Sequence, residues 1–377
     1  MELDPAMVPT PCYVIDTAKL EENGRLLKQV ASRVGCKILL ALKGFASYPF
    51  FPVIKPYIEG AAASSLNEAH LAFEHLGGEI HLYAPAYKEE EFPELMQYCD
   101  HVVFNSFNQW RRFREQVERK GASPGIRINP RHSEVKVTKY DPCAPGSRLG
   151  VPPEVFLNED LSGLEGIHFH TLCESGAEAL KRTLEAVEER FAPALNAMKW
   201  VNFGGGHLIT RTDYNRGLLC ELLRSFSGRY GVQVYLEPGQ AVALDAGVLV
   251  AKVLDIVEND GLTAILDTSA AAHMPDVLEM PYRPRVRGAG DPGTTPYTYR
   301  LAGCSCLAGD VIGEYAFPEP LKPGDKIIFE DMAHYTIVKN NTFNGVNLPS
   351  IAKFDSRTGE FEVLKRFSYT DFKSRLG

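Results

Sequence analysis

The amino-acid sequence predicts an α/β protein in which a (β/α)8 barrel is followed by a C-terminal antiparallel β domain. Between Lys37 and Glu237, eight strand signals alternate with crossover segments, which is the sequence rhythm of such a barrel. After Gln240, β-branched runs separated by turn clusters replace the helical signals. We therefore place the barrel at residues 20–240 and the β domain at residues 1–19 and 241–377.

The expected strands are short apolar runs, typical of strands buried on both faces. The first begins at Lys37, and later ones lie at 79–83, 101–105, 125–129, 166–170, 200–203 and 232–236. The segment 10–16 is β-rich, and helices are expected at 19–34, 66–76 and about 177–197. A capping box formed by Ser65 and Glu68 opens the second of these helices. The polar, proline-punctuated segment 130–153 predicts a long loop, a feature usually functional or mobile.

Composition limits the classes of function. The 377 residues are 45% hydrophobic with a net charge of −8, which argues against a nucleic-acid partner. No secretory signal opens the chain and no apolar run approaches membrane-spanning length, so we expect a protein that is neither exported nor membrane-bound. The eight cysteines form no CxxC pair, which disfavours a structural zinc site and suits reduced thiols in the cytoplasm.

The main candidate for chemistry is Lys43, which ends the first barrel strand and precedes a glycine and an aromatic residue. Barrels keep their active sites at the carboxyl ends of the strands. Desolvation there disfavours an ammonium and lowers its pKa, which suits an amine that forms a Schiff base. The alternative is a lysine that extends its head group out of the strand end, since lysine stems bury readily.

Two further patterns follow or end buried strands. Gly204–Gly206 come directly after the seventh strand signal, where barrels often hold a phosphate on backbone N–H groups, although a tight turn accounts for three glycines equally well. His168 and His170 point to the same side of one strand. They can chelate a metal, or one neutral imidazole can stack on a planar ring.

A carboxylate also stands at a strand end. Glu237 precedes a stiff Pro-Gly turn, where it can pair with a cationic ring nitrogen or remain a solvated turn residue. In the β domain, Cys304 and Cys306 lie two residues apart, a spacing that indicates loosely packed thiols rather than a metal clamp. We therefore assign no residue as a metal ligand.

Taken together and in this order, these segments resemble the fold-type III decarboxylases, an alanine-racemase-like family that uses pyridoxal 5′-phosphate and includes ornithine and diaminopimelate decarboxylases. The resemblance runs from Thr10-Pro11 to Phe343-Asn344-Gly345. It implies that Lys43 forms the Schiff base with the cofactor. The other cofactor contacts that it implies are His170 on the ring, Glu237 on the ring nitrogen, and Gly204, Gly205, Gly206 and Tyr335 on the phosphate.

The same resemblance implies how catalysis and substrate binding are completed. Cys306 corresponds to the general acid that returns a proton to Cα, and the family places it, with Asp310, in the active site of a partner subunit. We therefore expect a homodimer with shared active sites. Segments such as Ala41–Phe45 and Thr342–Pro349 are similar to the branch that acts on carboxynorspermidine and carboxyspermidine. An acidic lining suits these cationic polyamines, and the candidates are Glu174, Asp267, Asp276, Glu279 and Asp310.

The expected function is thus a decarboxylase that forms norspermidine or spermidine and CO2 in polyamine biosynthesis. Leu172-Cys173, Gln240 and Leu307 depart from the family, which commonly has glycine-serine, arginine and an acidic residue there. One alternative is a decarboxylase of diaminopimelate or another basic amino acid. Another, from a different class, is a metal-dependent barrel hydrolase that uses His168 and His170 as ligands. A non-catalytic homologue would lack Lys43 or Cys306, and both are present.

Overall fold

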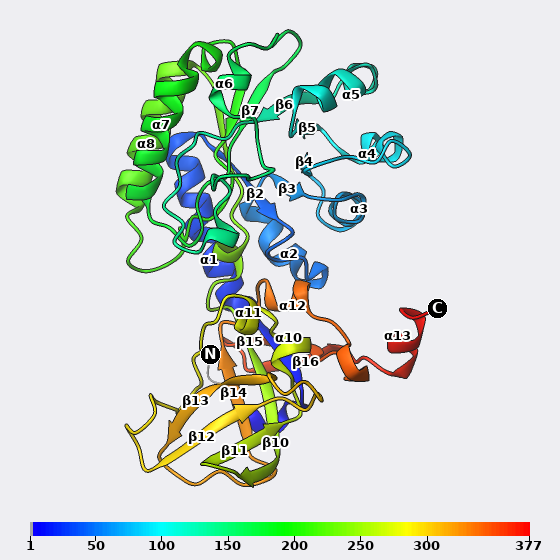
Figure 1. Cartoon of the computed structure of the whole chain (residues 1–377), viewed down its shortest axis with the longest axis vertical. Helices are drawn as coiled ribbons and strands as arrows, with labels where there is room; N and C mark the ends of the chain where they lie inside the picture. Colours follow the sequence, from blue (N-terminus) through cyan, green and yellow to red (C-terminus); the bar gives the residue numbers. More distant parts are fainter. Residues whose placement is uncertain (1–2) are drawn as a thin grey trace. The chain divides into compact units, whose positions relative to one another are not determined.

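The computed structural model describes residues 3–377, and the chain divides into two compact units. The unit Glu22–Val242 contains a closed parallel barrel. The other unit joins the N-terminal segment up to Glu21 with Ala243–Gly377 and is built on an eight-stranded sheet (Figure 1). The fold class is therefore the expected one, a (β/α)8 barrel with a separate β domain.

The barrel strands follow one another in chain order around the closed sheet. They are β2 (Lys37–Ala41), β3 (Gly60–Ala63), β4 (Glu79–Tyr83), β5 (His101–Phe104), β6 (Ser123–Arg127), β7 (Gly166–His168), β8 (Trp200–Asn202) and β9 (Gln233–Leu236). The first and last strands close the barrel, with Lys37 opposite Tyr235 and Ile38 opposite Leu236. The ring is continuous, so the carboxyl ends of all eight strands share one face.

Helices connect these strands on the outside of the barrel (Figure 1). Those between barrel strands are α2 (Phe51–Ile54), α3 (Leu66–His75), α4 (Phe92–Tyr98), α5 (Phe107–Lys120), α6 (Pro153–Phe156), α7 (Ala177–Leu195) and α8 (Arg216–Tyr230). Helix α1 (Thr17–Val34) precedes β2, and α9 (Gln240–Ala243) follows β9. Ser65 caps α3 by accepting a hydrogen bond from the N–H of Glu68 at 3.2 Å. The Glu68 carboxylate accepts from the N–H of Ser64, one residue before the cap, so the predicted capping box is displaced by one position.

Small residues make room inside the barrel for large ones. A Cβ atom on Gly125 or Gly166 would lie 2.3 or 2.0 Å from the ring of Trp200, so this indole fills the space beside both glycines. Strand β3 contains only glycine and alanine because it packs closely on β4, where a Cβ on Gly60 would lie 1.9 Å from the carbonyl oxygen of Glu79. Dense packing here fixes the strands that carry the candidate site at their opposite ends.

The sheet of the second unit has the strand order β13-β12-β11-β10-β1-β15-β16, with β14 paired to β10. Its strands are β1 (Cys12–Asp16), β10 (Gly247–Glu258), β11 (Leu262–Leu266), β12 (Tyr297–Ala302), β13 (Val311–Phe317), β14 (Lys326–Glu330), β15 (Ser350–Asp355) and β16 (Glu360–Lys365). Its short helices are α10 (Ala270–His273), α11 (Asp276–Glu279), α12 (Thr336–Lys339) and α13 (Tyr369–Ser374). The sheet packs against two hydrophobic clusters, one around Tyr13, Leu249 and Phe329 and one around Cys12, Val14 and Val250.

The pairing in this sheet is mixed rather than purely antiparallel. Strand β1 pairs in parallel with β15, and β11 pairs in parallel with β12. Parallel neighbours need a long crossover, and the segment between β11 and β12 contains α10 and α11. The alternation of apolar and polar residues in the sequence indicates strands, but it does not show which distant strands pair with each other. Among residues 3–377, no helix is long and apolar enough to cross a membrane.

Candidate active site

Lys43 and His170 meet at the carboxyl end of the barrel. Lys43 follows β2 and His170 follows β7, and Nζ of the lysine lies 3.3 Å from Nε2 of the imidazole. On the other side of the ring, the N–H of Gly205 donates to Nδ1 at 2.9 Å. Because Nδ1 accepts this bond, the neutral imidazole carries its proton on Nε2 and directs it toward the lysine.

The surroundings lower the pKa of both groups of this pair. Burial lowers the pKa of Lys43, and the nearby Arg127 lowers it further, although Glu237 raises it. Burial also holds the pKa of His170 well below its usual value, and the cationic neighbours Lys43 and Arg127 act in the same direction. A lysine with a lowered pKa loses its proton more readily, and the resulting amine has the lone pair that can attack a carbonyl carbon.

A second network holds Glu237 beside this pair. Oε1 of Glu237 accepts from Nδ2 of Asn202 at 2.6 Å, and Oε2 lies 3.4 Å from Nε2 of His168. The amide oxygen of Asn202 accepts from the N–H of Gly204 at 2.8 Å. Burial raises the pKa of Glu237, but His168 outweighs it and lowers the pKa to about 2. The carboxylate is therefore ionised at neutral pH.

The three predicted glycines pass through a space where side chains do not fit. A Cβ atom on Gly204 would lie 2.6 Å from Cβ of His170, one on Gly205 2.3 Å from the carbonyl oxygen of Glu237, and one on Gly206 2.0 Å from that of Leu172. Gly204 and Gly206 have φ values of +69° and +83°, which favour glycine. The N–H groups of Gly204 and Gly205 position Asn202 and His170, so the run organises the site as well as shaping a loop.

Three residues of this site were not predicted from the sequence as site residues. Asn202 is fully buried and links Gly204 to Glu237, Arg127 donates from Nη2 to the carbonyl oxygen of His170 at 3.1 Å, and Glu68 acts electrostatically on Lys43. The guanidinium of Arg127 lies 4.5 Å from the centroid of the Tyr83 ring. Asn202 and Arg127 are polar residues ending apolar strands, the same signal that identified Lys43.

Glu174 occupies the rim of this region in a strained conformation. Its φ is +49°, a left-handed value that costs a non-glycine residue free energy and often marks a functional position. The side chain is exposed, and one oxygen accepts from Nε2 of Gln240 at 2.9 Å. Gln240, which stands where the family commonly has arginine, thus orients one of the predicted substrate-binding carboxylates.

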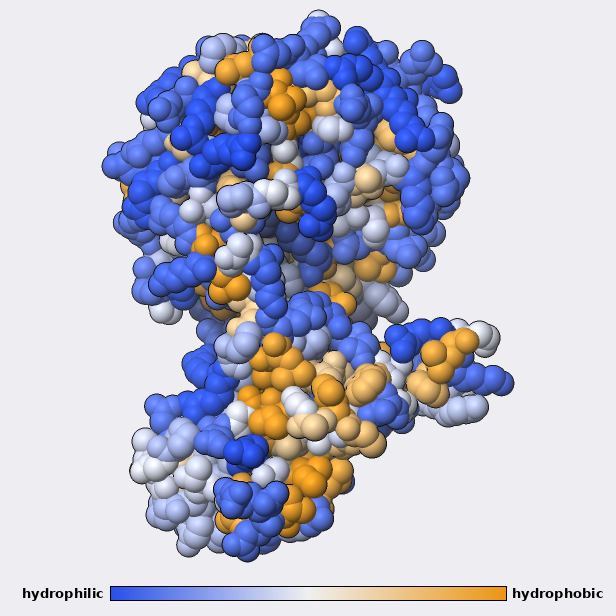
Figure 2. Space-filling model, in the orientation of Figure 1, coloured by the Kyte–Doolittle hydropathy of each residue, from blue (hydrophilic) through white to orange (hydrophobic). Residues whose placement is uncertain are grey.

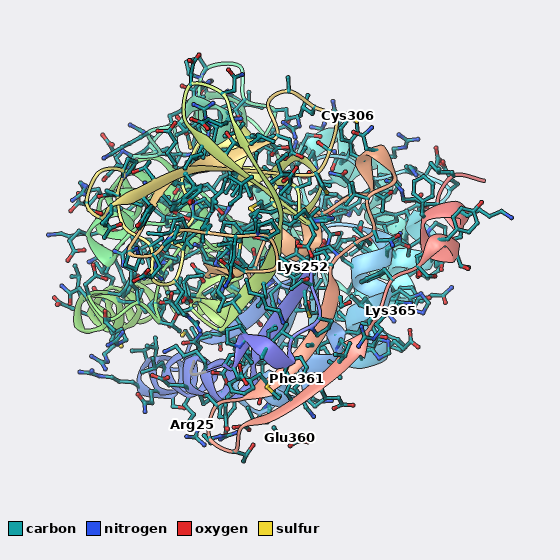
Figure 3. All side chains as sticks on the ribbon, turned by 90° about the horizontal axis from the view of Figure 1, so that it is seen from below. Arg25, Lys252, Cys306, Glu360, Phe361 and Lys365 are labelled. Carbon is teal, nitrogen blue, oxygen red and sulfur yellow. The ribbon has the colours of Figure 1, made fainter. Side chains whose placement is uncertain are left out.

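In the second unit, Cys306 and Asp310 share one loop but differ in exposure. Cys306 is exposed, lies on a peripheral loop in Figure 3, and donates its N–H to Oδ1 of Asn344 at 2.7 Å. Asp310 is buried, and its oxygens accept from the N–H groups of Ala270, Ala271 and Ser305 and from the hydroxyls of Ser269 and Ser305. The Asp310 carboxylate therefore holds the loop that presents Cys306.

The other predicted acids of this unit also have internal contacts. Asp276 and Glu279 both form ion pairs with Nζ of Lys339, and Oδ1 of Asp267 accepts from the N–H of Lys252 at 2.7 Å. Tyr335, at the start of α12, has a φ of +43°, a second strained position among the predicted site residues. Asp267, Asp276 and Glu279 lie in a different unit from Lys43.

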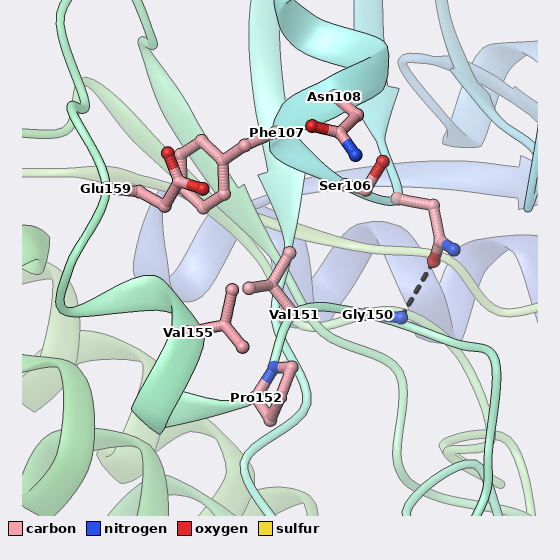
Figure 4. Close-up of a pocket in the computed structure, with 9 residues that line it drawn as sticks. Ser106, Phe107, Asn108, Gly150, Val151, Pro152, Val155 and Glu159 are labelled. Carbon is pink, nitrogen blue, oxygen red and sulfur yellow. Dashed lines mark hydrogen bonds between the residues drawn. The ribbon is translucent and has the colours of Figure 1, made fainter.

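A separate pocket of about 180 Å³ lies beside the start of α5 (Figure 4). Its lining residues are Asn105, Ser106, Phe107, Asn108, Gly150, Val151, Pro152, Val155 and Glu159. The N–H of Gly150 donates to Oδ1 of Asn105 at 2.7 Å, and Glu159 pairs with Arg111. None of the predicted site residues lines it, and it offers no group of the kind found around Lys43.

A lysine with a lowered pKa, a proton-bearing imidazole and an ionised carboxylate at the mouth of a barrel define a site for carbonyl–amine chemistry. Residues 12–333 match the family described as pyridoxal-dependent decarboxylase, C-terminal sheet domain, and the chain belongs to this family. The enzyme is a pyridoxal-dependent decarboxylase, and the residues around Lys43 fit the cofactor that this family uses.

Named relatives match the whole chain. A carboxynorspermidine/carboxyspermidine decarboxylase of Campylobacter jejuni is 45% identical, with 98% of each chain covered. A carboxyaminopropylagmatine decarboxylase of Synechocystis is 44% identical, with 98% of this chain and 96% of the relative covered. The crystal structure of a Campylobacter jejuni carboxynorspermidine decarboxylase complexed with norspermidine is similar, with a TM-score of 0.91, 45% identity, and 98% of this chain and 100% of that chain covered.

Proposed function

We propose that this enzyme decarboxylates carboxynorspermidine and carboxyspermidine, releasing norspermidine or spermidine and CO2 in polyamine biosynthesis. The observation that carries the proposal is the full-length similarity, at 45% identity and a TM-score of 0.91, to a carboxynorspermidine decarboxylase complexed with norspermidine. Diaminopimelate decarboxylases, the alternative substrate class, match at only 22% identity. Likeness at that level supports a common fold and not a common substrate.

The cofactor is held, in this proposal, by residues of the barrel unit and by Tyr335. Lys43 would supply the amine for the cofactor's aldehyde, His170 would pack on the ring, and Glu237 would pair with the ring nitrogen. Gly206 and Tyr335 contribute to phosphate binding, and Gly204 and Gly205 hold Asn202 and His170 in place. Pyridoxal phosphate, when bound, supplies an electron-withdrawing ring that stabilises negative charge at Cα after CO2 leaves.

Three side chains of the protein control where protons are bound during the reaction: Lys43, Glu237 and Cys306. The lowered pKa of Lys43 makes its ammonium easier to deprotonate, which favours the amine that acts as the nucleophile. Glu237 is ionised, and its negative charge favours a protonated ring nitrogen. Cys306 is exposed on its loop, and we assign it the proton that returns to Cα.

A second candidate substrate, carboxyaminopropylagmatine, comes from the name of a similar relative. Carboxyaminopropylagmatine is named in the Synechocystis relative, which is 44% identical to this chain. Its agmatine end carries a planar guanidinium, whereas carboxynorspermidine ends in an ammonium. A guanidinium is bound best by a carboxylate that accepts two parallel hydrogen bonds from it. An ammonium is a compact charge, and one hydrogen bond to a carboxylate oxygen is sufficient to bind it.

We further propose a homodimer whose active sites combine Lys43 of one subunit with Cys306 of the other. Hydrophobic residues gather on the visible face of the second unit, whereas hydrophilic residues dominate the visible face of the barrel unit (Figure 2). Exposed apolar side chains of the second unit include Leu254, Val257, Tyr282, Leu307 and Phe343. Such a surface is typical of one covered by a partner. The eight free thiols suit the reducing cytoplasm, where we place the enzyme.

The substrate proposal is tested by CO2 release from six compounds at equal concentration. They are carboxynorspermidine, carboxyspermidine, carboxyaminopropylagmatine, meso-diaminopimelate, ornithine and lysine. We expect the first two to have the highest kcat/KM. A highest value for carboxyaminopropylagmatine would move the enzyme to the second substrate, and a highest value for diaminopimelate would contradict a polyamine substrate altogether.

The cofactor assignment is tested on the purified protein independently of substrate. Borohydride reduction followed by peptide mapping should place a pyridoxyl adduct on Lys43, and Lys43→Ala should lose both the adduct and activity. Lys120, at the exposed end of α5, serves as the control position. An adduct on a lysine other than Lys43 would refute the assignment.

A further inference from the structure

A second cluster of titratable side chains lies at the opposite end of the barrel from Lys43. Glu79 is the first residue of β4, His101 is the first residue of β5, and Lys37 is the first residue of β2. The amino ends of parallel strands meet at one face, and the active site of such a barrel lies at the other face. This cluster is therefore separate from the pyridoxal site.

The geometry of the cluster brings three metal-binding groups together. One ligand atom each from Glu79, His81 and His101 lie within 4.8 Å of one another. His81 and His101 are direct neighbours in the register of β4 and β5, and their ring centroids are 3.9 Å apart. Nε2 of His81 lies 3.6 Å from Oε2 of Glu79. Two imidazoles and one carboxylate are a ligand set that zinc and similar divalent metals use.

Three of the four imidazole nitrogens have no hydrogen-bond partner among residues 3–377. His81 is only 1% exposed, yet neither of its ring nitrogens has a hydrogen-bond partner within residues 3–377, and neither does Nδ1 of His101. Buried polar groups are nearly always hydrogen-bonded, since an unpaired one costs free energy. Two adjacent imidazoles in this state indicate that something other than protein completes the cluster.

We propose that Glu79, His81 and His101 bind one divalent transition-metal ion of the Zn²⁺ class. The hydroxyl of Tyr235 donates to Oε2 of Glu79 at 3.0 Å and orients the carboxylate from outside the ligand set. Lys37 forms an ion pair with Oε1 of Glu79, and its side chain is 34% exposed, so the ammonium can move into solvent when a metal enters.

Such an ion would cross-link two adjacent strands of the barrel, because Glu79 and His81 belong to β4 and His101 belongs to β5. The role is structural, so the readouts are metal content and thermal stability rather than activity.

The test uses tag-free holoenzyme treated with a chelator, dialysed, and then exposed to Zn²⁺ or Co²⁺. Elemental analysis should find about one ion per chain, and saturation should raise Tm by about 5 °C. His101→Gln and Glu79→Gln should abolish both effects. His75→Gln, in a surface His–Glu pair with the same 3.6 Å separation, should retain them.

A gain of affinity separates the proposal from a simple loss of folding. Lys37→Gln removes the competing cation while keeping every ligand, so it should tighten Co²⁺ binding about tenfold, as measured by titration of the Co²⁺ absorption bands. Wild-type protein without stoichiometric metal would overturn the proposal. Equal binding by wild type and the His101→Gln and Glu79→Gln variants would overturn it as well.

Discussion

The N–H of Gly205 donates a hydrogen bond to Nδ1 of His170 at 2.9 Å, and this contact decides which ring nitrogen faces Lys43. Because Nδ1 is an acceptor, the proton of the neutral ring lies on Nε2, 3.3 Å from the lysine amine. A backbone amide thus sets the tautomer of a side chain that we place on the cofactor ring. The glycine is required because a Cβ at this position would lie 2.3 Å from the carbonyl oxygen of Glu237.

Replacing Gly205 with alanine should therefore disturb both His170 and Glu237. We expect Gly205→Ala to weaken pyridoxal phosphate binding at least about tenfold, since the displaced backbone loses a hydrogen bond worth about 1 kcal/mol and forces a steric shift of similar cost. Equilibrium dialysis of the cofactor measures this. Gly228→Ala, in helix α8 with no atom within 4 Å of the added carbon, is the matched control and should bind normally. Normal binding by both variants would contradict the assigned role.

The sequence was sufficient to locate residues at strand ends but not their partners. Lys43, His170 and Glu237 each follow or end an apolar run, and the barrel rule places such positions on one face. Asn202 and Arg127 end apolar runs too, yet their roles depend on contacts across the barrel, which no local pattern encodes. The parallel pairs of the second sheet were missed for the same reason, because their partners are far apart in the chain.

The cluster at the other end of the barrel illustrates the same limit. Glu79, His81 and His101 were expected only as residues of buried strands, and no metal ligand was assigned. The sequence shows a glutamate two residues before a histidine and a second histidine twenty residues later, a spacing that matches no compact motif. Only the register of β4 and β5 brings the two rings side by side.

The negative charge of Glu237 should affect both the activity of the enzyme and its stability at low pH. Glu237→Gln keeps the shape but removes the charge, and a hydrogen bond to a charged group is worth about 1.5–3 kcal/mol, so kcat should fall by about one to two orders of magnitude. Glu221→Gln, on the exposed face of α8, should leave kcat unchanged. A kcat within twofold of wild type would exclude the charge pairing that we assign to Glu237.

The same carboxylate gives a defined pH dependence of stability. Its pKa in the folded protein is about 2, below the ordinary value of 4.5. A depressed carboxyl pKa contributes stability that is present above the unfolded pKa and is lost as pH falls toward the folded pKa. The difference in unfolding free energy between wild type and Glu237→Gln, about 3 kcal/mol at most, should therefore shrink between pH 4.5 and pH 2. Urea unfolding at pH 7, 4 and 3 measures it, and a constant difference would contradict the shift.

Shared active sites predict complementation between two inactive variants. Lys43→Ala and Cys306→Ala should each abolish activity, but a heterodimer of the two contains one site with both wild-type residues. After complete subunit exchange, half of the dimers are mixed, so activity should return to about a quarter of the wild-type value. Two differently tagged preparations of Lys43→Ala, mixed in the same way, are the control. Confirmed exchange without recovery would refute sharing.

Neutralising the predicted acidic residues one at a time should distinguish those that stabilise the fold from those that bind the substrate. Asp310 is buried and accepts hydrogen bonds from three N–H groups and two hydroxyls, so Asp310→Asn should lower Tm and disorder the Cys306 loop. Glu174 is exposed and accepts a hydrogen bond from Gln240. Glu174→Gln should therefore leave Tm unchanged.

Glu174→Gln should instead weaken the binding of the polyamine substrate. A charged hydrogen bond to a substrate ammonium is worth about 1.5–3 kcal/mol, so kcat/KM for carboxynorspermidine should fall by about one to two orders of magnitude. Asp267→Asn, Asp276→Asn and Glu279→Gln complete the series, and Glu319→Gln, exposed on a turn, is the control. Because Lys339 already pairs with both Asp276 and Glu279, we expect smaller losses there than at Glu174. An unchanged kcat/KM in Glu174→Gln, with a large loss in Asp276→Asn or Glu279→Gln, would move the polyamine contact to the second unit.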